Sequence, residues 1–159
     1  MQNVHMQIDI PGHEQPLVLD KVIFDLNGTL TTDGKLIDGV EGRMKELRDR
    51  CSDLFLFTGD THGNGAAIAE RLGLELRKTT GTQQKADEAR KLGASTCAAI
   101  GNGRIDVELF KIVRLRIATI QAEGLHPMAA ENSDIIVPSI NDAIDLLLKE
   151  KRLIASLRK

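Results

Sequence analysis

Short apolar runs alternate along this chain with segments in which apolar residues recur at a helical period. The runs are typical of strands in a buried sheet and lie at residues 22–24, 54–57, 97–100, 116–120 and 134–137. Between them, one helical face is apolar in the segments 40–47, 105–112 and 140–147. Strands that alternate with helices predict parallel βαβ units and therefore an α/β fold.

The expected helix ends agree with this pattern, and the start of the chain differs from it. Gly73 and Gly93 follow helical segments and Ser139 precedes one, as glycine C-caps and a serine N-cap do. Before the first buried run, two short extended stretches flank Pro11-Gly12, which predicts a β-hairpin. We therefore expect a single domain over residues 1–159, with a hairpin at 1–20, an α/β core at 21–148 and a C-terminal helix at 149–159.

The composition argues against several classes of function. Lys and Arg number 21 and Asp and Glu 23, a net charge of −2, so no excess of positive charge attracts nucleic acid. The chain has no Trp or Tyr and only 4 Phe, and so offers few rings on which bases could stack. Its apolar runs are far shorter than the roughly 20 residues of a membrane span, and its first residues lack the pattern of a secretory signal. We expect a cytoplasmic protein that binds neither nucleic acid nor membranes.

Familiar metal and cofactor motifs are incomplete. Cys51 and Cys97 stand far apart without a CxxC pair or a neighbouring His, which favours core thiols over a disulfide or a zinc site. The histidines are scattered and form no pair with metal-ligand spacing. Two GxG stretches lack the third small residue of a dinucleotide-binding loop, because Ile68 and Asp106 stand at that position.

Polar residues follow the ends of several expected strands, where ligands bind in an open parallel sheet. Together they supply a nucleophile, a hydroxyl group, a cation and oxygen atoms suited to a metal. They are Asp25-Leu26-Asn27-Gly28-Thr29, Thr58-Gly59-Asp60, Gly101-Asn102-Gly103 with Asp106, and Lys85 at the start of a helix.

Each of these groups also has an ordinary structural interpretation. Asn27-Gly28 between apolar residues is a strong signal for a type I′ turn, and Thr58 is suited to cap a helix. Lys85 lies in a charged segment and on its own is typical of a solvated helix face. Asn102-Gly103 followed by Asp106 is compatible with a turn and an acidic first helical turn.

Taken in order, the motifs D-x-x-G-T, T-G-D, a later Lys and G-N-G-x-x-D resemble the four motifs of the haloacid dehalogenase superfamily. Within it, DLNGTLTTDG and LFTGDTHGNGAAIAERLGLE are similar to the phosphorylation domain of P-type ATPases and to soluble P-type ATPase-like proteins. The resemblance covers residues 21 to 148. It implies a three-layer α/β/α, Rossmann-like parallel sheet, here without a cap domain, because each gap between the motifs holds only one βα unit.

The resemblance also implies a role for each motif residue. Asp25 would accept a phosphoryl group as an aspartyl phosphate, with Asn27, Thr58 and Lys85 as the other catalytic residues. The phosphate would be bound by residues of the first three motifs, namely Gly28, Thr29, Thr58, Gly59 and Lys85. A magnesium ion would be held by oxygen atoms of Asp25, Asn102, Asp106 and the Asn27 backbone carbonyl.

Two residues depart from the family pattern. Phosphatases of the superfamily usually carry an Asp two residues after the nucleophile, to protonate the leaving group, where this chain has Asn27. Losing a general acid costs about 10² to 10⁴ in rate, so hydrolysis of alkyl phosphates should be slow. P-type ATPases have Thr there and keep a long-lived phosphoenzyme. Asn102 replaces a common Asp and removes a negative charge beside the metal.

We therefore expect a magnesium-dependent phosphatase that acts on a small phosphorylated substrate, best on aryl or acyl phosphates. With no cap, the substrate would be enclosed by a neighbouring copy in a homo-oligomer or by a macromolecule, and the N-terminal hairpin is a candidate for that interface. One alternative is a catalytically weak protein that binds phosphate or a phosphorylated metabolite for regulation. Another is a structural subunit with vestigial motifs.

Overall fold

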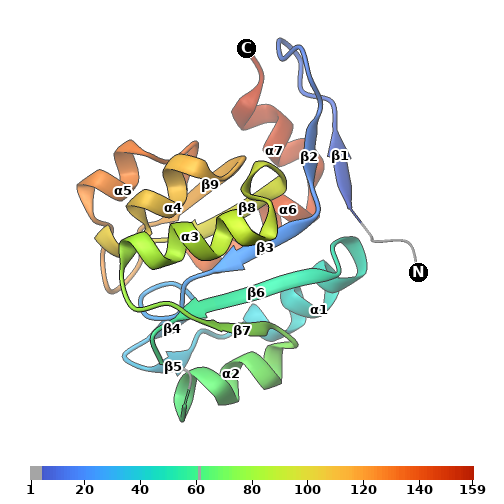
Figure 1. Cartoon of the computed structure of the whole chain (residues 1–159). Helices are drawn as coiled ribbons and strands as arrows, with labels where there is room; N and C mark the ends of the chain where they lie inside the picture. The colour runs from blue at the N-terminus through green and yellow to red at the C-terminus, as the bar shows by residue number, and fades with distance from the viewer. Residues whose placement is uncertain (1–4, 61) are drawn as a thin grey trace.

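A six-stranded sheet in which all neighbouring strands are parallel forms the centre of the computed structural model (Figure 1). The structure describes residues 5–60 and 62–159, so residues 1–4 of the expected hairpin segment lie outside the described residues. The strand order is β10-β9-β8-β3-β6-β7. The strands are β3 (Lys21–Phe24), β6 (Asp53–Thr58), β7 (Glu75–Lys78), β8 (Cys97–Gly101), β9 (Leu115–Thr119) and β10 (Ile135–Val137). The expected α/β fold is confirmed.

Helices cover both faces of this sheet, which gives three layers (Figure 1). The side chains of β3 show how: Val22 and Phe24 belong to one apolar cluster and Ile23, pointing the other way, to a second. The first cluster is completed by α1 (Val40–Arg50), α2 (Asn64–Leu72), α6 (Ile140–Leu148) and α7 (Glu150–Leu157). The second is completed by α3 (Thr82–Leu92), α4 (Val107–Ile112) and α5 (Pro127–Glu131).

The chain reverses its direction of travel across the sheet at β3. It passes from β3 outward through β6 to β7, and then returns to β8, on the other side of β3. This is the topological switch point of an open parallel sheet, where the loops after two adjacent strands part and leave a crevice. The motif residues Asp25 and Asn102 follow these two strands directly.

The N-terminal hairpin is present and packs against the C-terminal helix of the same chain. Strand β1 (Met6–Ile8) pairs antiparallel with β2 (Leu17–Leu19), and their apolar side chains share a buried cluster with Leu153 of α7. The Lys159 N–H donates to the Pro11 carbonyl at 3.0 Å, and His13 Nε2 donates to the Leu157 carbonyl at 2.8 Å. Because β2 leads directly into β3, the hairpin lies at the amino end of the sheet, opposite to Asp25 (Figure 1).

A second, very short hairpin follows Asp25 and was not expected. It joins β4 (Thr31–Thr32) to β5 (Lys35–Leu36) through Asp33 and Gly34, whose φ angles are 52° and 79°. Two positive φ angles are the mark of a type I′ turn, for which Asp-Gly is a preferred pair. Among the described residues Asp33 is the one non-glycine with positive φ, so Asn27-Gly28 does not form the type I′ turn considered above.

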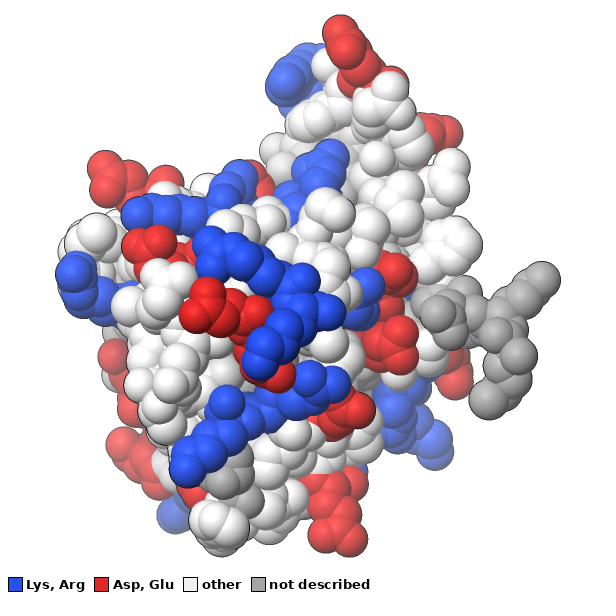
Figure 2. Space-filling view, viewed as in Figure 1, with Lys and Arg blue, Asp and Glu red and all other residues white. Residues whose placement is uncertain are grey.

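Strand β7 was also not predicted, because it is an edge strand made largely of charged residues. Its side chains form ion pairs with one another and with α3, as between Arg77 and both Glu75 and Glu88. On the face shown in Figure 2, Lys and Arg lie among Asp and Glu rather than in a field of one sign. Charged residues on an edge strand protect it from pairing with another chain.

The expected helix caps and core thiols are present in the structure. Gly73 and Gly93 end their helices in the left-handed conformation, and the Ser139 side chain caps α6. The helix expected at 105–112 begins as a 3₁₀ turn, Arg104–Asp106, before α4. Cys51 and Cys97 are buried free thiols, and burial raises the pKa of each to about 11. No helix in the part of the chain that the structure describes combines the length and apolarity that crossing a membrane requires.

Candidate active site at the carboxyl ends of β3 and β8

Asp25 lies immediately after β3, at the centre of the sheet edge. Its N–H donates to the Ile100 carbonyl at 3.1 Å, which continues the ladder between β3 and β8 by one residue. This bond fixes the backbone that carries the carboxyl group, and the side chain is only 11% exposed. The fold therefore holds an acidic group, nearly buried, at the carboxyl edge of the sheet.

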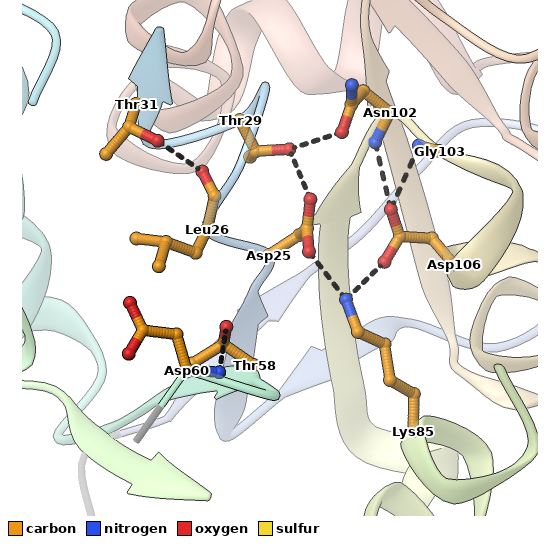
Figure 3. A network of polar contacts seen from close by, with 10 residues as sticks. All are labelled: Asp25, Leu26, Thr29, Thr31, Thr58, Asp60, Lys85, Asn102, Gly103 and Asp106. Carbon is orange, nitrogen blue, oxygen red and sulfur yellow. Dashed lines mark hydrogen bonds and ion pairs between the residues drawn. The ribbon is translucent and has the colours of Figure 1, made fainter. Parts of the chain in front are cut away.

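Lys85, on α3, contacts this carboxylate and joins it to a second one. Its Nζ donates to Asp25 Oδ1 at 2.6 Å and to Asp106 Oδ1 at 2.8 Å (Figure 3). Lys85 is buried in the first turns of α3, and so is not the solvated surface cation considered above. The other oxygen of Asp106, Oδ2, accepts the N–H groups of Asn102 and Gly103, both at 3.1 Å.

This buried triad holds two negative charges and one positive charge. Burial, followed by the charge of Asp106, raises the pKa of Asp25 to about 6, although Lys85 opposes the shift. Burial lowers the pKa of Lys85, but the charges of Asp25 and Asp106 raise it more, so that its pKa lies above the ordinary lysine value. Lys85 thus remains protonated, and Asp25 is ionised at neutral pH.

Thr29 connects Asp25 to Asn102. Its hydroxyl group, fully buried, lies 3.2 Å from Asp25 Oδ2 and 3.1 Å from Asn102 Oδ1 (Figure 3). Asn102 is oriented by its other side-chain atom, because Nδ2 donates to the Gly124 carbonyl at 3.1 Å. One hydroxyl proton can serve only one of the two oxygens at a time, so the other keeps free lone pairs.

Two glycines allow this close packing. Gly28 has a φ of 78°, and a Cβ atom there would lie 2.4 Å from Asn102 Nδ2. A Cβ atom at Gly101 would lie 2.4 Å from Asp106 Oδ2. Both glycines therefore leave room for the neighbouring side chains. The Gly28 N–H is already bonded to the Thr31 carbonyl at 2.9 Å, so it is not free for a phosphate.

Thr58 lies on the other side of Asp25 from Asn102 (Figure 3). Its Oγ1 accepts the Asp60 N–H at 3.1 Å, which leaves the hydroxyl proton available for an acceptor in the crevice. Asp60 in turn accepts the N–H of Gly65 through its carboxylate at 3.1 Å, near the start of α2. Thr58 is thus held by its own loop rather than by the triad.

Two further predicted site residues lie at the surface. Asn27 is exposed on the loop that follows Asp25, and Gly59 is exposed next to Thr58. The structure therefore gathers Asp25, Thr29, Lys85, Asn102 and Asp106 into one hydrogen-bonded network and leaves Asn27, Thr58 and Gly59 at its rim.

The oxygen atoms beside Thr29 are suited to a hard cation. Asp25 Oδ2 and Asn102 Oδ1 converge on one hydroxyl group, and carboxylate and amide oxygens are ligands that magnesium prefers. Asp106 matches the predicted metal role less well, because Lys85 and two N–H groups already occupy both of its oxygens. No group of three or more His, Cys, Asp or Glu residues gathers in residues 5–60 and 62–159, so a zinc-type ligand cluster is not formed there.

Gln121 is a part of the site that the sequence did not indicate. It follows β9, and its Nε2 donates to the carbonyls of Gly28 and Thr29 at 2.9 and 2.7 Å. Its Oε1 accepts the N–H of Ile140, at the start of α6, at 3.0 Å. A single glutamine in a loop belongs to no motif, and the one available signal was its place just beyond the carboxyl end of a strand.

No family model matches the chain, but individual known proteins are similar to it in sequence. The chain is 27% identical over 143 residues to a soluble P-type ATPase-like phosphatase from Methanocaldococcus jannaschii, a match that covers 87% of this chain and 52% of the relative. An uncharacterized protein of the same organism is 50% identical over 60 residues, which are 38% of this chain and 64% of that one. The chain thus spans about half to two thirds of the length of these relatives.

Solved structures share the fold at low sequence identity. A 3-deoxy-D-manno-octulosonate 8-phosphate phosphatase from Moraxella catarrhalis, crystallised with magnesium, phosphate and KDO, has a TM-score of 0.68 and 18% identity. That match covers 88% of this chain and 94% of the other. With its four motifs in order and most of their residues gathered at the switch point of the sheet, the chain resembles a soluble P-type ATPase-like phosphatase in sequence and haloacid dehalogenase (HAD) family hydrolases and phosphatases in fold.

Proposed function

We propose that this protein is a magnesium-dependent phosphohydrolase that works through an aspartyl phosphate on Asp25. The observation that carries the proposal is the contact of Lys85 with both Asp25 and Asp106 at the switch point of the sheet. Burying a lysine with two carboxylates costs desolvation free energy. Buried groups with shifted pKa values are concentrated at functional sites.

The chain's own residues supply most of what phosphoryl transfer requires. Lys85 holds the Asp25 carboxylate in one orientation and lies where it can neutralise phosphoryl oxygens. The Thr58 hydroxyl, with its proton free, can donate to the same oxygens from the opposite side. Asp25 Oδ2, Asn102 Oδ1 and the Asn27 carbonyl would hold magnesium, which reduces the repulsion between a carboxylate and an anionic phosphate.

The reaction proceeds in two displacements at phosphorus. A carboxylate oxygen of Asp25 forms a bond to phosphorus while the bond to the leaving-group oxygen breaks, and that oxygen keeps the electron pair. Water then attacks phosphorus, and the bond to Asp25 breaks with its electron pair on the carboxylate. The protons of the water leave on the phosphate, which releases one to the solvent at neutral pH. An amide at Asn27 can neither protonate the leaving group nor accept the proton of the water, so both steps proceed without an acid or base at that position.

The absence of a general acid at position 27 determines which phosphate compounds the protein would hydrolyse. Aryl and acyl phosphates have leaving groups that are stable as anions, and so need no proton, whereas alkyl phosphates do. The crevice has no cap domain within the described residues, and a small phosphorylated substrate would reach it directly. Solved structures with this fold include a phosphatase named for a small sugar phosphate, which supports a small phosphorylated substrate but not the preference for aryl or acyl phosphates.

Hydrolysis of p-nitrophenyl phosphate with Mg²⁺ tests the proposal. Asp25→Asn should lower turnover by about 10³-fold or more, since it removes the nucleophile. Asp49→Asn, at an exposed position on α1, is the matched control and should behave like the wild type. Equal rates for Asp25→Asn and the wild type would remove Asp25 from the mechanism.

Asn27→Asp tests the role of the missing acid. If proton transfer limits turnover, this variant should hydrolyse an alkyl phosphate such as glycerol 3-phosphate about 10²-fold faster or more, with a smaller gain on p-nitrophenyl phosphate. An unchanged rate on the alkyl substrate would mean that Asn27 is not the cause of slow turnover.

A second candidate is a protein that binds phosphate or a phosphorylated metabolite for regulation without efficient turnover. Asn27 and Asn102 favour it, because each replaces an acidic residue by an amide while leaving the triad intact. Calorimetry with phosphate and Mg²⁺ separates the two candidates. Tight binding without turnover supports regulation, and no binding at millimolar phosphate rejects it.

A further inference from the structure

Gln121 links three segments that are distant in sequence. It lies in the turn after β9, contacts the loop that follows Asp25 through two hydrogen bonds, and contacts the first residue of α6 through a third. A primary amide suits this position, since it presents donors to two carbonyl groups and an acceptor to an N–H group. A carboxylate of the same size would turn negative oxygen toward both carbonyls.

The two carbonyls that Gln121 binds belong to the peptide groups on either side of Thr29. The bond to the Gly28 carbonyl fixes the peptide plane before Thr29, and the bond to the Thr29 carbonyl fixes the plane after it. With both planes fixed, the direction of the Thr29 side chain is fixed as well. That side chain is the one whose hydroxyl lies between Asp25 Oδ2 and Asn102 Oδ1.

The same turn also orients Asn102, the second residue whose side-chain oxygen would bind the cation. Gly124, three residues after Gln121, accepts the Nδ2 of Asn102 and so orients its Oδ1 toward Thr29. Glu123 accepts the N–H of Asp33 in the short hairpin after the nucleophile loop, at 3.2 Å. Residues 121–124 thus connect the loop after β3 to the loop after β8.

We propose that Gln121 is a positioning residue, which holds the Asp25 loop in the conformation that aligns Thr29, Asp25 and Asn102 for the metal and the phosphoryl group. This inference rests on the proposed phosphohydrolase function. Gln121 acts through the backbone of Gly28 and Thr29 and does not contact the reacting atoms. Partners behind metal ligands commonly affect metal affinity or activity by about 10- to 100-fold.

Two variants separate this role from a merely structural one. Gln121→Leu removes all three hydrogen bonds, whereas Gln121→Glu keeps an acceptor for Ile140 and loses both donors to the loop. Gln7→Leu, on the exposed face of β1, is the control for replacing a glutamine far from the site. Folding of each variant is checked by thermal unfolding, and assays are run well below the midpoint.

Turnover and ligand binding are both measured. We expect both Gln121 variants to lower kcat on p-nitrophenyl phosphate about 10-fold or more, with a smaller change in KM. Calorimetry should show a similar weakening in the binding of Mg²⁺ with beryllium fluoride, which does not depend on turnover. If the contact with α6 were the one that matters, Gln121→Glu would match the wild type while Gln121→Leu would not.

The inference is overturned if both Gln121 variants stay within twofold of the wild type in kcat and in calorimetric affinity while Asp25→Asn is inactive. It is also overturned if they lose only thermal stability. Failure of the proposed function looks different, because the wild type and Asp25→Asn would then show equal activity.

Discussion

Asp25 combines two properties that oppose each other in a buried carboxyl group. It must be ionised to act as a nucleophile, yet burial and the nearby Asp106 favour its neutral form. Lys85 offsets only part of this cost, so the protein carries an unfavourable charge at the position where the chemistry would occur. Unfavourable electrostatics of this kind reduce the stability of the fold and have a pH dependence that can be measured.

We therefore predict that Asp25→Asn is more stable than the wild type at pH 8 when metal is chelated. The pKa of Asp25 is about 6 in the folded protein against an ordinary value of 3.8, so the folded state binds more protons than the unfolded state between these limits. The contribution of Asp25 to stability therefore falls as the pH rises from about 4 to about 6.

Urea denaturation of the two proteins from pH 4 to pH 8 measures this effect. The difference should grow with pH to on the order of 3 kcal/mol and then remain constant. Asp49→Asn, which is exposed, should show no such trend. A difference between Asp25→Asn and the wild type that does not vary with pH would contradict the raised pKa.

Gly28 offers a second prediction, because another glycine has almost the same backbone conformation. Gly28 and Gly34 have φ angles of 78° and 79°, but a Cβ atom at Gly28 would lie 2.4 Å from Asn102 Nδ2, against 3.9 Å from Asn64 Nδ2 at Gly34. Replacement by Ala should cost about 1–2 kcal/mol at either position from the left-handed backbone. Gly28→Ala should cost about 1–3 kcal/mol more, because Asn102 must move.

The Gly28 and Gly34 variants should also differ in metal binding. Displacing Asn102 separates its Oδ1 from the Thr29 hydroxyl, so Gly28→Ala should weaken Mg²⁺ binding, as measured by calorimetry, while Gly34→Ala should not. Equal losses of stability and equal metal binding in the two variants would show that the contact with Asn102 is not restrictive.

Among the elements, the N-terminal hairpin is the one whose role changed most from expectation. It was a candidate for an interface with a neighbouring copy at the active site. In the structure its apolar side chains are buried against α7, and it lies at the opposite end of β3 from Asp25. An interface formed by the hairpin would therefore lie far from the crevice of its own chain, and a homo-oligomer remains a prediction.

We predict that the hairpin is an integral part of the hydrophobic core. Leu17 is fully buried, whereas Val18, on the other face of the same strand, is partly exposed. Leu17→Ala should lower the free energy of unfolding by about 2–5 kcal/mol, and Val18→Ala should lower it by much less. Both should keep the activity of the wild type while folded. Equal, small losses in urea denaturation would mean that the hairpin is only loosely attached.

Taken as a whole, the molecule joins a rigid sheet to a site assembled from loops that end its strands. The triad of Asp25, Lys85 and Asp106 holds two negative charges and one positive charge. A divalent cation should therefore bind the folded protein and stabilise it. A ligand present at 100 times its dissociation constant adds about 2.7 kcal/mol to the stability of the folded state. The unfolded chain has no comparable site, because the ligands come from different loops.

We predict that millimolar Mg²⁺ raises the midpoint of thermal unfolding, and that Asn102→Asp increases this shift. Without metal, Asn102→Asp should be less stable than the wild type, because it adds a negative charge near Asp25 and loses the hydrogen bond to Gly124. With metal, the added charge should strengthen binding. Thermal unfolding with Mg²⁺ and with EDTA measures both effects, and a wild-type midpoint that does not respond to Mg²⁺ would contradict the metal site.

The alternation of buried runs and amphipathic segments was enough to predict the parallel α/β fold, because burial on both faces of a central sheet requires such runs. Strands β3, β6, β8, β9 and β10 were predictable for this reason. Strand β7 was not, since an edge strand stabilised by ion pairs with α3 carries no hydrophobic signal. The order of the motif residues also indicated which side chains share the sheet edge.

Other features depend on how distant segments pack, and no local pattern carries that information. Lys85 is a buried partner of Asp25 and Asp106 only because α3 lies against the loops after β3 and β8. Both oxygens of Asp106 accept hydrogen bonds, one from Lys85 and the other from two backbone N–H groups. Gln121, after β9, donates to the carbonyls of Gly28 and Thr29 in the loop after β3. Hydrogen bonds between residues far apart in sequence follow from three-dimensional proximity. The order of residues could therefore indicate which side chains lie at the sheet edge, but not the contacts that support them.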